Sequence, residues 1–211
     1  MLPLGEPKFR RRKAERPDEI VAAALEVFSQ KGFAAARLDD IAVRAGVSKG
    51  AIYLYFATKE DIFRAVVEQA VAPNLAIAKA MAGQPASFAD MARGFANITG
   101  QLAQNSPLGG IVKMVVSEAG NFPELASIWY ERLVAPAIAL ISDVIAQAQV
   151  RGEVRPGDPR HYALCLVAPT LVGVIWRETF TPVGAPAFDI PALALQNVET
   201  VLRGMKPDST L

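Results

Sequence analysis

Apolar residues recur every three or four positions along most of the chain, which is the period of amphipathic helices. No segment shows the strict apolar–polar alternation of a half-buried strand, so the pattern predicts an all-α fold of about nine helices. Glycine, proline and capping residues mark the ends of these helices. The predicted helices cover residues 17–31, 38–45, 49–56, 59–73, 87–104, 107–118, 121–151, 158–180 and 190–203.

Pro73 and Pro136 fall inside apolar helical patterns. Pro136 lies in the middle of residues 121–151, where the loss of its N–H and the crowding of the preceding turn predict a kink. Near Pro73 we interpret the alanine-rich segment up to Gly83 as a continuation of the same helix beyond a bend. Both prolines therefore indicate long helices that are not straight.

The stretch from Leu38 to Lys59 has the pattern of two short helices that meet at a sharp angle. Ile41 belongs to the buried face of the first helix, and Gly46 suits the left-handed turn that follows it. Ser48 can cap the second helix by accepting a hydrogen bond from a free backbone amide, and Ile52 points back into the core. A small residue in the turn and a polar second helix are what a helix-turn-helix requires. We interpret this stretch as a DNA-reading unit.

Residues in and around this stretch resemble the DNA-binding signature of TetR/AcrR-type regulators. The resemblance covers about residues 17–67 and is carried by Gly32-Phe33, Asp40-Ile41-Ala42, Ala45-Gly46-Val47-Ser48-Lys49-Gly50, Tyr53, Phe56 and Lys59-Glu60-Asp61. Arg37 departs from the pattern, because the family usually has Thr or Ser just before the second helix. The resemblance implies a three-helix DNA-binding domain followed by a helical domain for effector binding and dimerisation.

The second helix of the motif carries residues suited to contact DNA. Ser48 and the amides it caps face a phosphate in the DNA-bound arrangement, and Lys49 can donate to guanine or to phosphate. The resemblance implies that Tyr53 contacts the phosphate backbone and that Tyr55 lies in or beside the groove. The predicted DNA-binding residues are Ser48, Lys49, Gly50, Ala51, Tyr53, Tyr55 and Lys59. The alternative is that the two tyrosines pack in the core and that Lys59 is a solvated lysine.

The second half of the chain is expected to supply dimerisation. The resemblance implies that the last two predicted helices pair with their copies in a four-helix bundle. Their apolar residues exceed what one amphipathic face requires. The dimer-interface candidates are Leu164, Leu171, Ile175, Leu195, Val198 and Leu202. Packing within a single subunit is the alternative explanation for the same residues.

An effector would occupy a cavity among the predicted helices between residues 87 and 180. The candidate lining residues are Phe95, Met114, Trp129, Tyr130 and Trp176, with Arg177 or Glu178 as a polar anchor. Each aromatic position is also compatible with plain core packing. The shortage of charge in these helices favours an apolar or aromatic ligand.

Composition and charge limit the class of protein. Through residue 65 there are 12 Lys/Arg against 9 Asp/Glu, and the remainder has 10 against 12, so the basic end coincides with the predicted DNA-binding unit. Residues 1–16 hold six of these cations and are predicted to be a flexible arm that can lie along phosphates. A single cysteine excludes an internal disulfide and suits the cytoplasm. Neither a secretion signal nor a membrane span is expected.

Catalysis and metal binding find little support in the sequence. His161 and Cys165 lie four residues apart, so a thiolate–imidazole pair is geometrically feasible, but Cys165 sits in an apolar run typical of packing. One histidine and one cysteine do not make a metal cluster. Gly109-Gly110 lacks the surrounding pattern of a phosphate-binding loop. We therefore expect neither a metal nor a cofactor.

Together these features predict a homodimeric, ligand-responsive transcriptional regulator, and specifically a repressor that a small effector releases from its operator. The predicted organisation is a flexible basic arm over residues 1–16, a helix-turn-helix domain over 17–64, and an effector-binding and dimerisation domain over 65–211. The expected partners are double-stranded operator DNA, an effector and a second copy of the chain. Two alternatives stay open: a DNA-binding protein without a ligand, and a helical enzyme that uses His161 and Cys165.

Overall fold

The protein is built from helices and the turns between them. A computed structural model describes residues 8–83, 86–106 and 108–207, and it contains no strand within these ranges. Its elements are α1 (Lys8–Ala35), α2 (Leu38–Ala45), α3 (Lys49–Tyr53), α4 (Lys59–Ala82), α5 (Phe88–Asn105), α6 (Leu108–Glu118), α7 (Pro123–Trp129), the π-helical turn η1 (Tyr130–Val134), α8 (Ala135–Val150), α9 (Pro159–Thr179), the 3₁₀ turn η2 (Thr181–Val183) and α10 (Ile190–Gly204). Because α7, η1 and α8 follow one another without a break, the described residues hold nine helices besides η2, in agreement with the prediction.

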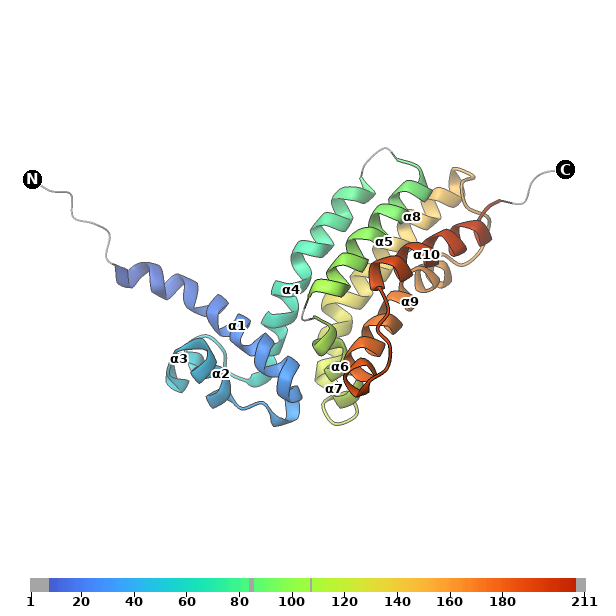
Figure 1. Ribbon diagram of the computed structural model, residues 1–211. Coiled ribbons are helices and arrows are strands. Elements are labelled where there is room, and N and C mark those ends of the chain that lie inside the picture. Colours follow the sequence, from blue (N-terminus) through green and yellow to red (C-terminus); the bar gives the residue numbers. More distant parts are fainter. Residues whose placement is uncertain (1–7, 84–85, 107, 208–211) are drawn as a thin grey trace, which may run out of the picture.

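Helix α1 is longer than the sequence pattern suggested. It begins at Lys8 rather than near Pro17, and its first turns project away from the rest of the N-terminal unit (Figure 1). Lys, Arg, Ala and Glu fill this stretch and are good helix formers, whereas Pro17 removes only one backbone hydrogen bond. Residues 1–7 of the predicted arm lie outside the described residues. At the other end Gly32 adopts a φ of 75°, which interrupts the helix where its end was predicted.

The helices that contain Pro73 and Pro136 are long, as predicted. α4 opens with a reciprocal cap in which the Asp61 N–H donates to Thr58 Oγ1 at 3.1 Å and the Thr58 N–H donates to Asp61 Oδ2 at 3.0 Å. The helix predicted over residues 121–151 runs from α7 to α8 and contains η1 directly ahead of Pro136. A proline cannot donate to the carbonyl four residues earlier, and the wider π turn accommodates this loss.

Buried apolar side chains form two clusters, and their division does not follow the boundary between the two predicted domains. The first cluster joins α1–α4 to α6 and α7, and its centre is an aromatic group in which Phe33 lies 5.4 Å from Phe28, 6.0 Å from Phe63 and 5.3 Å from Phe122 between ring centroids. The second cluster joins α5, α8, α9 and α10. By packing, α6 and α7 therefore belong with the N-terminal unit.

Two glycines allow pairs of helices to cross closely. An added Cβ at Gly110 on α6 would lie 3.2 Å from the Cα of Ser29 on α1. An added Cβ at Gly100 on α5 would lie 2.8 Å from the Cα of Pro191 on α10. Because backbone atoms cannot move aside as a flexible side chain can, these positions fix the distance between the paired helices.

We predict that Gly100→Ala destabilises the protein by about 1–3 kcal/mol, because the new methyl group forces α10 away from α5. Chemical denaturation measures the loss. Gly120→Ala is the matched control, since a Cβ at Gly120 meets no atom within 4 Å, and it should change stability by less than about 0.5 kcal/mol. Equal stabilities of the two variants would contradict the close crossing.

Candidate functional site

The helix-turn-helix is formed by α2 and α3. Gly46 ends α2 in the left-handed conformation at φ 65°, and the Val47 N–H donates to the Ala42 carbonyl at 3.0 Å. Ser48 Oγ accepts from the Ala51 N–H at 3.2 Å and caps α3. Ile41, Ala42 and Ile52 are buried in the first cluster. The turn and both caps thus follow from local side-chain chemistry, as predicted.

The N-terminus of α2 is capped without the usual Ser or Thr. Arg37 has no side-chain acceptor, but the Asp40 carboxylate accepts from the Arg37 N–H at 3.1 Å. Lys31 on α1 pairs with the other oxygen of Asp40 at 2.8 Å. The Lys31 ammonium and the Arg37 N–H together hold the pKa of Asp40 below its usual value. One carboxylate therefore caps α2 and also ties it to α1.

The outer face of the motif carries most of the predicted DNA-binding residues. Ser48, Lys49, Gly50 and Tyr53 are exposed, whereas Ala51 and Tyr55 are half-buried and Tyr55 packs against the first cluster. Lys49 Nζ pairs with Asp39 Oδ2 at 3.0 Å, and this contact raises the pKa of Lys49. Leu54 at the end of α3 is also exposed, as is Val43 on α2, which the sequence did not single out. The exposed surface thus combines a cation, hydroxyl groups and apolar side chains.

Lys59 is turned inward in this structure. Its Nζ donates to the carbonyl oxygens of Phe33 at 2.6 Å and Ala36 at 3.1 Å, and it lies 4.2 Å from the centroid of the Phe33 ring. The side chain therefore fixes the connection between α1 and α2. Phosphate binding by Lys59 stays a prediction. It would use the N–H of the ammonium group that is not donated to Phe33 or Ala36, or it would require the side chain to change rotamer.

Glu118 joins the C-terminus of α6 to the same connection. Its Oε1 accepts from the Phe33 N–H at 3.0 Å, and its Oε2 accepts from the Ala34 N–H at 2.7 Å. The left-handed Gly32 directs both amides toward the carboxylate, and a Cβ at Gly32 would lie 2.4 Å from Glu118 Oε1. Sequence reasoning did not identify Glu118, because its partners are 84 and 85 residues away.

A large apolar cavity lies between α4, α5, α6, α8 and α9. Its volume is about 420 Å³, and carbon atoms make up almost the whole of its wall. Along α5 the lining residues run from Phe88 to Ala103, about 22 Å at the rise of an α-helix. Thr99 and Thr170 are among the lining residues, and the Thr99 hydroxyl donates to the Phe95 carbonyl at 2.8 Å; no charged side chain lines the wall within the described residues.

The cavity contains some of the predicted effector contacts and not others. Phe95 and Trp129 line it, whereas Met114 is buried in the first cluster and Tyr130 is exposed on η1. Trp176 packs against Phe180 and Phe188 and donates its Nε1–H to the Pro186 carbonyl at 2.9 Å. Residues that the sequence did not single out include Met81, Met91, Leu133, Ile141 and Val144.

The guanidinium of Arg177, the predicted polar anchor, is already engaged. Its Nη1 donates to the carbonyl oxygens of Ala103 and Gln104 at the end of α5, the latter at 3.0 Å. Its Nη2 pairs with Glu178 Oε1 at 2.7 Å. The structure does not place Arg177 on the cavity wall.

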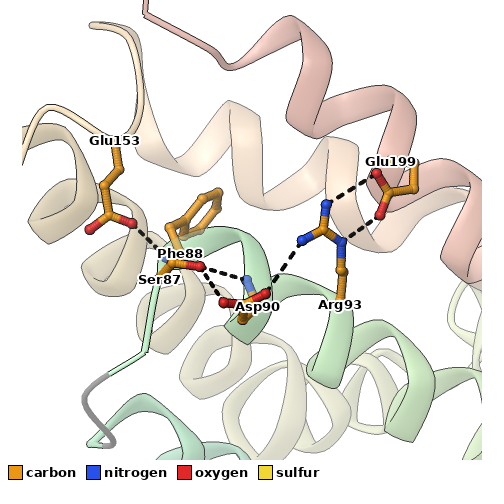
Figure 2. Close-up of polar contacts among 6 residues, drawn as sticks. All are labelled: Ser87, Phe88, Asp90, Arg93, Glu153 and Glu199. Atoms are coloured by element: carbon orange, nitrogen blue, oxygen red, sulfur yellow. Dashed lines mark hydrogen bonds and ion pairs between the residues drawn. The ribbon is translucent and has the colours of Figure 1, made fainter.

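The N-terminus of α5, at the opposite end of the cavity, is held by the turn after α8 and by α10 (Figure 2). Glu153, from the turn after α8, accepts from the Phe88 N–H with Oε2 at 2.6 Å and pairs through Oε1 with Arg151 Nε at 2.5 Å. Arg151 and the Phe88 N–H hold the pKa of Glu153 below its usual value. Figure 2 also shows Arg93 on α5 bound by both carboxylate oxygens of Glu199 on α10, at 2.6 and 3.3 Å.

The predicted dimer-interface residues lie on α9 and α10. Leu164, Leu171 and Leu195 are exposed, and Val172 beside them is 60% exposed. Ile175 and Leu202 are half-buried, but Val198 is 2% exposed and belongs to the second cluster. In the single chain α9 therefore leaves apolar side chains uncovered.

The alternative of a helical enzyme that uses His161 and Cys165 receives no support from the geometry of these residues. His161 is exposed with Nε2 3.7 Å from Asp158, and Cys165 is an exposed free thiol rather than a buried one. The described part of the chain holds no group of three or more residues suited to bind a metal. Pro123–Val150 and Pro159–Val183 are long and apolar enough to cross a membrane by length and composition alone, a property they share with core helices of soluble proteins.

A helix-turn-helix that shares its core with a cavity-bearing helical domain defines a DNA-binding transcriptional regulator rather than an enzyme. Residues 20–66 match the family described as bacterial regulatory proteins, tetR family, and residues 87–187 match the tetracyclin repressor-like C-terminal domain. The chain belongs to the TetR family.

Relatives in this family support the assignment over different lengths. The HTH-type transcriptional regulator RutR of Escherichia coli is 30% identical over 175 residues, which cover 82% of this chain and 76% of RutR. The uncharacterized regulator YfiR of Bacillus subtilis is 41% identical over 56 residues, 26% of this chain and only 27% of that protein. The fold resembles that of FadR from Bacillus subtilis in complex with stearoyl-CoA, with a TM-score of 0.74, 19% identity, and coverage of 89% of this chain and 98% of FadR.

We predict that Glu153→Gln lowers the free energy of unfolding by about 0.5–1 kcal/mol at neutral pH. The glutamine amide keeps an oxygen that can accept from the Phe88 N–H but loses the negative charge that pairs with Arg151. A depressed pKa stabilises the fold above the unfolded pKa, and this contribution disappears as the pH falls through the folded pKa. The stability difference between wild type and variant should thus be constant near pH 7 and shrink below about pH 4. Denaturation at several pH values measures it, and a pH-independent difference would contradict the ionic role.

Proposed function

We propose that this protein is a homodimeric repressor that leaves its operator when an apolar effector fills the cavity of the helical domain. The observation that carries the proposal is the combination of an exposed, capped recognition helix with an apolar cavity whose wall includes α4 and α6. Both helices also pack in the first cluster with the helix-turn-helix. The cytoplasm is the expected location for such a regulator.

The DNA-binding part of the proposal rests on the outer face of α3. Ser48, Lys49 and Gly50 form the exposed N-terminus of this helix, where free amides and the helix dipole favour a phosphate. Tyr53 is 52% exposed on the same short helix and can donate its hydroxyl to the DNA backbone. One such unit makes few contacts, so two copies that read two half-sites are needed for selectivity.

The dimer part rests on the uncovered apolar side chains of α9 and α10. Leu164, Leu171 and Val172 on α9 and Leu195 on α10 are exposed in the single chain. Burial of such a patch against its copy removes apolar area from water. Packing of these two helices with those of a second chain in a four-helix bundle would place the two recognition units on one side of the dimer.

The effector part rests on the shape of the cavity. A volume of about 420 Å³ along about 22 Å of α5 leaves a narrow channel, suited to one extended hydrocarbon chain. The structurally similar FadR was solved with stearoyl-CoA, whose acyl chain has this character. We therefore favour an effector with a long alkyl or acyl chain over a flat aromatic one.

The proposed response is a change in the separation of the two recognition helices. An effector in the cavity displaces Ala78, Met81 and Ala82 on α4, which is continuous with the buried face at Ile62 and Phe63. Movement of α4 shifts each helix-turn-helix away from the ~34–36 Å spacing that one turn of DNA demands. Effector binding and DNA binding then oppose each other by linkage.

We predict that the protein binds the DNA flanking its own gene selectively and with a steep salt dependence. Lys49→Gln should weaken binding by about tenfold and lower the salt slope by about one per subunit, because one phosphate contact is lost. Tyr53→Phe should weaken binding while it leaves the salt slope unchanged, since the hydroxyl carries no charge. Fluorescence anisotropy between 50 and 300 mM salt is the measurement.

Lys79→Gln on α4 is the charge-matched control for this titration. Lys79 lies in the last turn of α4, at the far end from the helix-turn-helix (Figure 1). The control should bind DNA like the wild type. Equal loss in the control and in Lys49→Gln, or binding that is indifferent to sequence, would contradict the proposed recognition surface.

We predict that affinity for saturated alkyl ligands rises with chain length by about 0.8 kcal/mol per CH₂ and levels off once the chain exceeds about 22 Å. The fluorescence of Trp129, which lines the cavity, reports binding. Tight binding of polycyclic aromatic compounds with no response to alkyl chains would contradict a narrow channel. Release of DNA at the same ligand concentrations tests the link to repression.

A further inference from the structure

The two ends of the cavity differ in the charges they offer. At the end near α6, Arg177 is saturated by Glu178 and by the carbonyl groups of Ala103 and Gln104. The Glu178 carbonyl in turn accepts from Lys113 Nζ at 2.7 Å. Each charged group at this end already has a partner of opposite polarity, so nothing there requires a ligand.

The end near the start of α5 continues into a polar hollow. The hollow has a volume of about 470 Å³ and shares Ala82, Met91 and Val144 with the apolar cavity. Its polar wall comes from the end of α8 and the turn beyond it, where Gln147 and Arg151 lie near Glu153. A ligand longer than the cavity would therefore pass directly from an apolar channel into a polar one.

Arg151 is the cation of this hollow, and it is only partly engaged. Its Nε pairs with Glu153 Oε1, and Glu153 Oε2 is occupied by the Phe88 N–H. Within the described ranges neither terminal nitrogen of Arg151 has a protein acceptor, and the side chain is 43% exposed. Two parallel N–H groups are the donors that a carboxylate binds in a bidentate manner.

We propose that the polar hollow binds the compact anionic head group of the effector, a carboxylate held by Arg151, while the hydrocarbon chain fills the cavity. This inference rests on the hydrocarbon effector proposed above and adds the direction in which the ligand lies. The chain end points toward Trp129 and α6, and the head group remains beside the start of α5. Arg151 and Glu153 cancel in formal charge, so the terminal N–H groups of Arg151 hold the carboxylate by direct hydrogen bonds, and Gln147 lines the same hollow with an amide donor.

The test compares three probes with the same chain and different head groups: dodecanoate and dodecyltrimethylammonium below their critical micelle concentrations, and 1-dodecanol below its solubility limit. Affinities come from Trp129 fluorescence and calorimetry on the full chain. For the wild type we expect dodecanoate to bind about tenfold more tightly than 1-dodecanol, and the cation most weakly. Arg151→Gln should remove the preference for dodecanoate and leave the affinity for 1-dodecanol unchanged.

Arg160→Gln is the matched control, since Arg160 is exposed in the first turn of α9 and lines neither hollow nor cavity. It carries the same charge change and should retain the preference for dodecanoate. Equal binding of acid and alcohol to the wild type, or an undiminished acid preference in Arg151→Gln, would overturn the head-group site while the hydrocarbon effector stands. Failure of all three probes to bind would instead overturn the effector class. Thermal unfolding of each variant verifies that the fold is intact.

Discussion

The attachment of α6 to the connection between α1 and α2 is the contact on which the arrangement of the molecule depends. Glu118 binds two consecutive backbone amides beyond Gly32, and Gly110 lets α6 approach α1 to backbone distance. Lys59 secures the same connection from the start of α4. Because these contacts surround the aromatic group at Phe33, the helix-turn-helix and α6 share one close-packed core.

This shared core restricts how an event in the cavity reaches the DNA-binding surface. α4 and α6 each line the cavity with one part and enter the first cluster with another. α6 does so within its 11 residues, with Gly109 at the cavity and Glu118 at the α1–α2 connection. In the proposed response, a displacement at either helix would reach the motif through packed side chains and one carboxylate. Such packing transmits small shifts because it cannot absorb them.

The helix ends that depend on neighbouring residues could be predicted from the sequence. The side-chain contacts that depend on residues far along the chain could not. The left-handed Gly46 and the cap at Ser48 depend on neighbours within a few residues, so their sequence signals were reliable. The inward side chain of Lys59 and the role of Glu118 depend on carbonyl and amide groups more than 20 residues away. Spacing along a helix likewise identified apolar faces but not which cluster each face meets. Met114, which was predicted to line the effector cavity, is buried in the first cluster. Val198, which was predicted at the dimer interface, is buried in the second cluster.

The π turn between α7 and α8 has a consequence for how one long helix serves two cores. A π turn holds one residue more than an α turn, so it rotates every following side chain by about 100° around the helix axis. Leu125 and Ile128 before the turn face the core of the helix-turn-helix, and Ile145 and Ala148 after it face the core of the helical domain. Loss of a single residue from Tyr130–Val134 would restore a regular helix and turn the cavity wall of α8 toward solvent. The length of this segment is thus fixed to the residue, and some of its side chains are constrained as well, because Leu133 and Val134 line the cavity and Arg132 pairs with Glu68 at 3.2 Å.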